Sequence, residues 1–183
     1  MSRQHSRWGI NEAHFAAIGQ ITVAFQRLDW GLGYTVFILK GEQENIAKHV
    51  AANMFAAKLK KCEELFRQIL GRFGERGEGL RELFDEAHRA CDHANKARNG
   101  VIHAQYGIST KNGFVVEDLK GNAPGMPIIT AAEGSSVELF SIVDQIEQAD
   151  QKLMNFIGTF LGLYLREYQR RYALRPSETS TPI

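Results

Sequence analysis

The side chains best suited to chemistry in this sequence lie in one short segment. Arg98 and Asn99 are followed by His103, with Lys96 and Tyr106 on either side. A histidine accepts or donates a proton near neutral pH, and an arginine guanidinium is always charged and donates paired hydrogen bonds to a phosphate. These residue types predict phosphodiester chemistry. We expect Arg98, Lys96 and Tyr106 to bind the substrate.

Cleavage of RNA without a metal ion requires three groups of this kind. A base removes the proton of the 2′-hydroxyl, an acid protonates the leaving 5′-oxygen, and a positive charge stabilises the phosphorane oxygens. We assign acid and base work to His103, the phosphate to Arg98, and a phosphate oxygen or the orientation of His103 to Asn99. On an undistorted helix Arg98 and His103 would point roughly 140° apart. We therefore expect the helix end, or a symmetric dimer, to bring them together.

Other motif matches predict less. Asp85-Glu-Ala-His88 matches a helicase box, but the sequence lacks the phosphate-binding loop that such enzymes require. Asp85, His88 and Asp92 share one helix face, yet a di-iron bundle requires two Glu-x-x-His pairs and two further glutamates. We expect no metal ion and no cofactor. Gly31 and Gly33 lack the third glycine of a dinucleotide fingerprint, so we expect close helix packing there.

Apolar residues at helical spacing predict the elements that position this segment, and the fold class is all-α. The expected helices span residues 11–41, 44–70, 80–103 and 135–172. The first should bury a stripe that runs from Phe15 to Leu39, and the second should kink near Met54. The third should lie antiparallel to the second, and Ser135-Ser-Val-Glu138 is a capping box for the fourth.

The pattern changes to that of strands between the third and fourth helices. Asn112-Gly113 separates two β-prone runs, which favours a hairpin. We expect an antiparallel four-helix bundle with a small two-stranded β-hairpin inserted at about residues 104–131. A single domain should cover residues 11–174, with a flexible arm at 1–10 and a disordered tail at 175–183.

The composition is that of an ordinary globular protein. The chain has 183 residues, 44% hydrophobic and 23% charged, and a net charge of +1, so an RNA partner would require a local basic patch. Cys62 and Cys91 form no Cys-x-x-Cys pair, and we expect two reduced core thiols. The longest apolar stretch, 156–165, is about half of a membrane span. With no signal-peptide pattern, we expect a cytoplasmic protein without a membrane partner.

The segment Ala97–Gly107 resembles the Arg-x(4–6)-His signature of HEPN domains, a family of α-helical bundles that includes metal-independent endoribonucleases. Three pairs have this spacing: Arg7 with His14, Arg81 with His88, and Arg98 with His103. Only in the last is the arginine followed by asparagine at the end of an expected helix. Phe25-Gln-Arg-Leu-Asp29 is also similar to the first helix of several HEPN groups, and the resemblance covers about residues 12–172.

The resemblance implies a metal-independent endoribonuclease that acts on RNA and leaves a 2′,3′-cyclic phosphate, as toxins and defence effectors of this family do. It also implies a homodimer in which the two motifs meet at the interface, and an antitoxin or other protein as a further partner. Two alternatives remain open. One is a non-catalytic HEPN module that binds a nucleotide or a protein through the same groove, and the other is a structural helical oligomer.

Overall fold

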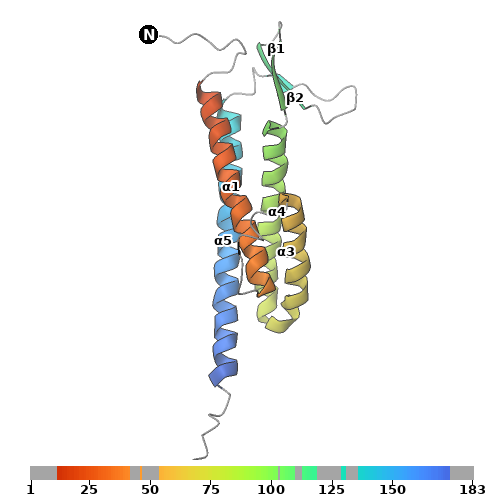
Figure 1. Cartoon of the computed structure of the whole chain (residues 1–183), viewed down its shortest axis with the longest axis vertical. Helices are drawn as coiled ribbons and strands as arrows, with labels where there is room; N and C mark the ends of the chain where they lie inside the picture. The colour runs from red at the N-terminus through yellow and green to blue at the C-terminus, as the bar shows by residue number, and fades with distance from the viewer. Residues whose placement is uncertain are drawn as a thin grey trace, which may run out of the picture.

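Four long helices make up the bundle in the computed structural model, which describes residues 12–41, 46, 54–102, 104–109, 113–118, 129–130 and 136–173. They are α1 (Glu12–Lys40), α3 (Phe55–Leu70), α4 (Arg76–Ile102) and α5 (Ser136–Ala173). A 3₁₀ helix, η1 (Gly71–Phe73), connects α3 to α4 (Figure 1). The expected arm at 1–10 and the expected tail at 175–183 lie outside the described residues.

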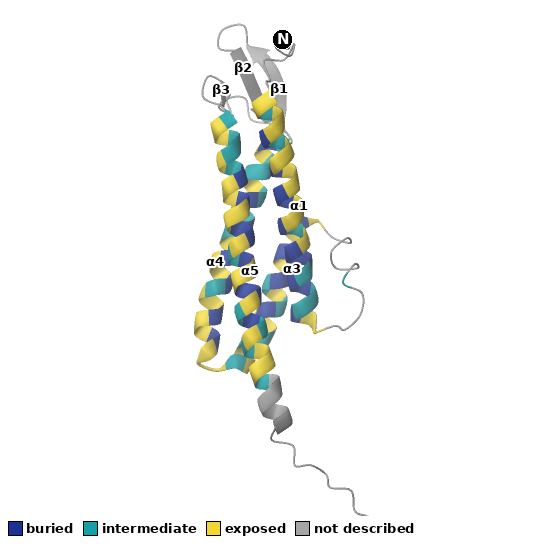
Figure 2. Cartoon of the chain, turned by 90° about the vertical axis from the view of Figure 1, so that its left-hand side faces the viewer, coloured by how far each residue is buried: buried dark blue, intermediate teal, exposed yellow. Residues whose placement is uncertain are grey.

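Each helix buries one stripe of apolar side chains at three- and four-residue spacing, as an amphipathic helix does. Figure 2 shows this division, with buried residues on the inner faces of the helices and exposed residues on the outer faces. The stripe of α4 contains Leu80, Phe84, Ala87, Cys91 and Ala94. The prediction of core thiols is confirmed, since Cys62 and Cys91 are both free and buried.

A cluster of three phenylalanines joins α3, α4 and α5 at the centre of the core. The Phe66 ring stacks on Phe84 with centroids 4.3 Å apart, and Phe156 meets Phe66 edge-on at 5.3 Å. Phe66 and Phe156 are each 1% exposed, so the whole ring area is removed from water. Burial of rings of this size contributes about 1.5–3 kcal/mol each, which makes the cluster a main source of bundle stability.

The helix directions correct the predicted fold class. Phe25 of α1 contacts Phe55 of α3, and Leu32, further along α1, contacts Cys62, further along α3. The residue numbers of the contacting pairs increase in both helices, so α1 and α3 are parallel. The same holds for α1 and α5, where Arg27 pairs with Asp150 and Gly31 faces Met154. These two helices are therefore parallel as well.

Only α4 runs in the opposite direction to these three helices, as Figure 1 shows. Phe84 of α4 contacts Phe156 of α5, whereas Glu86, further along α4, contacts Lys152, which comes earlier in α5. The two helices are therefore antiparallel. The expectation that α4 is antiparallel to α3 is confirmed by the contact between Phe66 and Phe84 beside the η1 turn. An antiparallel bundle of all four helices is therefore wrong.

The length of the connection between α1 and α3 allows their shared direction. α1 ends at Gly41, whose φ of 67° is a left-handed helix stop, and α3 starts beside Phe25. From Phe25 to Gly41 the helix rises about 24 Å, whereas the 13 residues before Phe55 can span up to about 43 Å when extended. The chain is thus long enough to return along the bundle before α3 begins.

The structure differs from the prediction at the start of α3 and at one residue of the α1 core face. Met54 is extended, with φ −61° and ψ 150°, so the continuous helix expected over residues 44–70 is wrong and α3 begins at Phe55. Phe15 was expected in the core but is 57% exposed, whereas Ile21, Leu28 and the rest of that stripe are buried. Gly31 does pack closely, since a methyl group added there would lie 2.7 Å from Cε of Met154.

The insert between α4 and α5 is a three-stranded sheet and not the two-stranded hairpin that the sequence predicts. β1 (Ala104–Ser109) pairs antiparallel with β2 (Gly113–Asp118), and β2 pairs antiparallel with β3 (Ile129–Thr130). The segment before β3 contains prolines and glycines, which do not favour a strand. Two residues carry too short an alternation to reveal a strand, so only pairing with β2 defines it.

The longest helix, α5, has 38 residues, but charged residues recur along its outer face. Among the described residues, no helix combines the length and the apolar character needed to cross a membrane.

Candidate functional site

Arg98 takes a position in the buried stripe of α4. Ala94 lies one turn before it and Val101 one turn after it, and both are buried. α3 begins at Phe55, which contacts Phe25 of α1, so Arg98 lies at the level where α3 begins. The Arg98 side chain is consequently half-buried, on the side of α4 that faces α1.

An aromatic pair supports the Arg98 guanidinium. Its Cζ lies 5.0 Å from the centroid of the Phe25 ring, and that ring lies 4.7 Å from the Phe55 ring. A cation over an aromatic face gains about 0.5–2 kcal/mol, depending on how far it is desolvated. Phe25 therefore holds the guanidinium in place without using any of its hydrogen-bond donors. The sequence placed Phe25 in the first helix, in the segment similar to HEPN groups, but did not predict its contact with Arg98.

Asn99 is a partner of Arg98. Nη1 of Arg98 donates to Oδ1 of Asn99 at 2.9 Å, and Nδ2 of Asn99 donates to Oδ1 of Asn95 at 3.4 Å. Asn99 thus orients the Arg98 guanidinium. The sequence instead predicts that Asn99 holds a phosphate oxygen or orients His103. A guanidinium has five N–H donors. Among the described residues no carboxylate forms an ion pair with Arg98, which leaves donors available to an anion.

Lys96 lies apart from Arg98. It is exposed, and its Nζ is 2.6 Å from Oδ2 of Asp92 one turn earlier on α4. Two residues of helix rotate the chain by about 200°, so Lys96 and Arg98 point to opposite sides of α4. The structure therefore does not bring together these two expected substrate-binding residues.

Of the other two expected site residues, the structure describes only the backbone of Tyr106. His103 lies outside the described residues, directly after the last residue of α4, Ile102. Tyr106 lies in β1, where its backbone pairs with Val116, and its side chain is outside the described part. Convergence of His103 with Arg98 stays a prediction.

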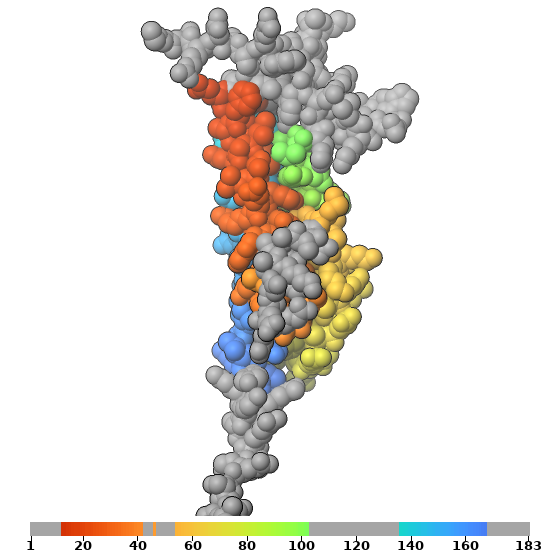
Figure 3. Space-filling view, in the orientation of Figure 1, coloured from red at the N-terminus to blue at the C-terminus, as the bar shows by residue number. Residues whose placement is uncertain are grey.

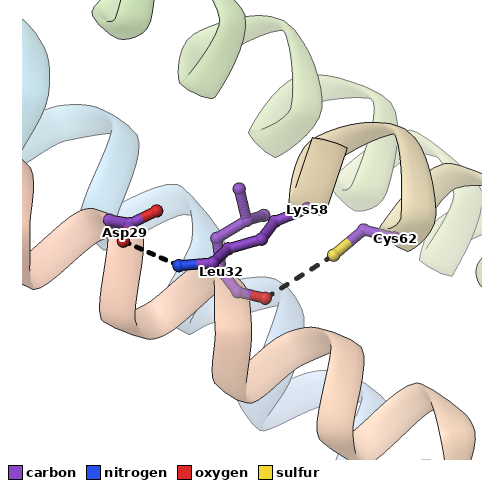
Figure 4. A network of polar contacts seen from close by, with 4 residues as sticks. All are labelled: Asp29, Leu32, Lys58 and Cys62. Atoms are coloured by element: carbon purple, nitrogen blue, oxygen red, sulfur yellow. Dashed lines mark hydrogen bonds and ion pairs between the residues drawn. The ribbon is translucent and has the colours of Figure 1, made fainter. Parts of the chain in front are cut away.

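A second group of polar side chains lies inside the bundle between α1 and α3. Nζ of Lys58, a residue 2% exposed, is 2.7 Å from Oδ2 of Asp29, and the Cys62 thiol donates to the carbonyl oxygen of Leu32 at 3.7 Å (Figure 4). This contact places Asp29 at the seam between α1 and α3. Lys58 was missed, although it stands three residues after Phe55 and four before Cys62, at core spacing.

Asp150 of α5 is a buried carboxylate, 8% exposed. Its Oδ2 accepts from Nε of Arg27 at 2.9 Å, and its Oδ1 has no hydrogen-bond partner. Burial, together with the nearby charge of Asp150, raises the pKa of the Cys91 thiol to about 12. Burial also raises the pKa of Cys62, with a smaller contribution from Cys91. Both thiols are therefore protonated at neutral pH and unsuited to act as nucleophiles.

A groove between α4 and α5 is lined mainly by polar residues. They are Glu86, Arg89, His93, Gln145, Gln148 and Lys152, and Ala90 and Ala94 complete the lining. Nζ of Lys152 is 2.9 Å from Oε1 of Glu86, and this contact lowers the pKa of Glu86. Arg98 is not among the lining residues, although Ala94, one turn before it on α4, is one of them.

The helix face that carries Asp85, His88 and Asp92 was expected to be free of metal. Within the described ranges, no three histidine, cysteine or acidic side chains are grouped closely enough to hold a metal ion. The His88 ring instead lies 5.8 Å from the Phe84 ring, and Asp92 pairs with Lys96.

Comparisons with protein-family models, curated proteins and solved structures find no match to this chain. The resemblance to HEPN domains accordingly rests on the Arg98–His103 segment and the first helix alone.

Proposed function

We propose that this protein binds the phosphodiester backbone of RNA at the C-terminal end of α4 and cleaves it without a metal ion. The carrying observation is the environment of Arg98, a cation in an apolar stripe that has an aromatic support but no carboxylate partner among the described residues. Charged groups at partly buried positions are normally paired, because desolvation of an unpaired charge is costly. A bound phosphate would provide the missing charge.

In the proposed reaction the three motif residues have separate roles. Arg98 binds the scissile phosphate and stabilises the charge that develops on its oxygens, while Asn99 keeps the guanidinium oriented. His103 accepts the proton of the 2′-hydroxyl as the 2′-oxygen attacks phosphorus, and returns a proton to the departing 5′-oxygen. The products are a 2′,3′-cyclic phosphate and a 5′-hydroxyl.

The end of α4 supports this division of roles. The regular helical spacing that would turn Arg98 and His103 about 140° apart applies only as far as Ile102, where α4 ends. Gly100, two residues before the end of α4, has no side chain, and no described atom lies within 4 Å of the position that a Cβ would take. The surface beside Gly100 is therefore open.

The test is cleavage of an end-labelled single-stranded RNA in EDTA, with product ends identified chemically. His103→Ala should lower the rate by about 10²-fold or more, the usual contribution of a positioned acid or base. Arg98→Lys keeps the charge but loses the planar pair of donors, and should lower the rate as well. His88→Ala and Arg89→Lys, on the same helix, are the matched controls and should leave cleavage unchanged.

Two results would contradict the nuclease mechanism. One is activity that disappears in EDTA and returns with Mg²⁺ or Mn²⁺. The other is an equal loss in His103→Ala and His88→Ala, which would place the chemistry outside this motif.

A non-catalytic RNA- or nucleotide-binding module is the second candidate. It is favoured by the hydrogen bonds of Asn99, which join Arg98 and Asn95 and serve binding as well as catalysis. Here the RNA would be bound but not cut, and Arg98→Ala would abolish binding while His103→Ala would not.

A further inference from the structure

Two asparagines, Asn95 and Asn99, lie one turn apart on the same side of α4, and we call them the amide pair. Asn99 accepts at Oδ1 from Nη1 of Arg98 at 2.9 Å, and its Nδ2 donates to Oδ1 of Asn95 at 3.4 Å. Hydrogen bonds therefore connect Asn95 to the Arg98 guanidinium, although the two side chains form no direct hydrogen bond.

The amide pair and Arg98 are open to a ligand. All three residues are half-buried, and they belong to the last turns of α4. Figure 3 shows this part of α4, in green, at the surface of the molecule beside α1. No described atom lies within 4 Å of the Cβ position at the neighbouring Gly100. A strand of RNA can thus reach the guanidinium from outside the bundle.

Helix formation does not explain the amide pair. Asparagine is a weak helix former, because its short polar side chain competes for the hydrogen bonds of the backbone. Asn95 stands seven residues before Ile102, the last residue of α4, which is too far from the helix end for a cap. The hydrogen bonds that the two side chains form are therefore the better account of their position.

Phe25 and the amide pair constrain the guanidinium in different ways. The attraction of a cation to a ring face fixes its distance from Phe25 but leaves its rotation about the ring axis free. The hydrogen bond to Asn99 removes this freedom. Asn99 must itself be held, and within the described part of the chain its amide nitrogen has no hydrogen-bond partner other than Asn95.

We propose that Asn95 is a positioning residue for RNA binding, which acts through Asn99 and fixes the direction in which Arg98 presents its donors to a phosphate. A guanidinium has five N–H donors, and Asn99 accepts one of them, so four remain. Asn95 does not touch the phosphate itself. This inference rests on the proposed function, because the phosphate of RNA is the ligand in both.

Nitrogen NMR of the full-length protein without RNA tests the positioning. A hydrogen bond at Nη1 slows rotation about the Cζ–Nη1 bond of Arg98, whose signals are assigned by their loss in Arg98→Lys. Asn95→Leu has nearly the size of the wild-type side chain but no acceptor. It should speed this rotation by about threefold or more, the contribution of one hydrogen bond, and so should Asn99→Ala.

Binding of a single-stranded 2′-O-methyl RNA, which cannot be cleaved, supplies the second measurement. Asn95→Leu should raise the Kd by about threefold to tenfold. The dependence of log Kd on log salt should stay that of the wild type, because Arg98 still meets the phosphate, whereas Arg98→Ala should lower that slope by about 0.7. Asn155→Leu, at an exposed asparagine of α5, is the matched control and should leave the Kd unchanged.

The double variant Asn95→Leu/Asn99→Ala distinguishes action through Asn99 from direct contact with RNA. It should bind no more weakly than Asn99→Ala alone, because the link to Arg98 is already broken. Losses that add, or a rotation of Arg98 that Asn95→Leu leaves unchanged, would overturn the proposal. If the wild type binds RNA no better than Arg98→Ala, the proposed function fails, and the rotation measurement alone decides the role of Asn95.

Discussion

Replacing Cys91 by alanine should change how the free energy of unfolding depends on pH above about pH 9. Burial and the charge of Asp150 raise the pKa of this thiol from 9.0 to about 12 in the folded chain. Between these two values the thiol ionises when the chain unfolds but not while it is folded. The stability that the protonated thiol contributes is therefore complete below the unfolded pKa and is lost as the pH rises toward the folded one.

Linkage gives the size of the effect. For a shift from 9.0 to about 12, the free energy of unfolding falls by about 1.4 kcal/mol at pH 10 and by about 2.7 kcal/mol at pH 11. Removing the small Cys91 side chain from the core should cost about 1 kcal/mol at pH 8. The wild type therefore starts as the more stable protein, and the order reverses by about pH 10.

Urea unfolding, followed by circular dichroism at several pH values from about 8 to 11, measures this difference directly. Ile146→Val is the matched control, because Ile146 is fully buried in α5 and its substitution removes one methyl group and no titrating group. Its difference from the wild type should not vary with pH. If the Cys91→Ala difference is equally constant, Cys91 is not held protonated by burial and the reasoning is refuted.

Two further substitutions probe the contacts between α1 and α5. Gly31→Ala should leave the midpoint of urea unfolding almost unchanged, because alanine favours the helix by about 1 kcal/mol and its methyl group overlaps with the flexible, partly exposed end of Met154 while lying at ordinary contact distance, 3.4 Å, from Leu153. Gly31→Leu should lose more than about 2 kcal/mol, because its larger side chain would overlap with Leu153 as well. Arg27→Ala leaves the buried Asp150 without its cation and should cost about 1–3 kcal/mol in the same assay, and Arg27→Lys should recover part of that loss. An Arg27→Ala protein as stable as the wild type would mean that the ion pair contributes nothing.

Local sequence was enough to locate the candidate site but not to build it. The position of Arg98 near the end of a helix follows from the 3.6-residue period and from the β-prone run after it. Its aromatic partner does not, because Phe25 lies far away in the chain and reaches Arg98 only when α1 packs against α4. The contact between Lys58 and Asp29 could not be predicted either, because the two residues are on different helices and meet only when α1 and α3 pack together.

The exposure of α1 shows the limit of periodicity. An apolar residue at helical spacing is predicted to be buried, and this holds for Ile21 and Leu28 but not for Phe15. α1 carries apolar residues on two sides, and spacing alone does not say which side meets the other helices. The contacts of Gly31 with α5 and of Leu32 with α3 decide it.

The sequence by itself determined the four helices, the stop at Gly41 and the burial of both thiols, because helix formation and helix ends depend on residues within a turn or two of one another. Only the tertiary structure decided that α1, α3 and α5 run in one direction and that a third strand joins the insert. Direction depends on which apolar faces meet, and the chain between Gly41 and Phe55 is long enough for either arrangement. Packing between distant residues selects one of them.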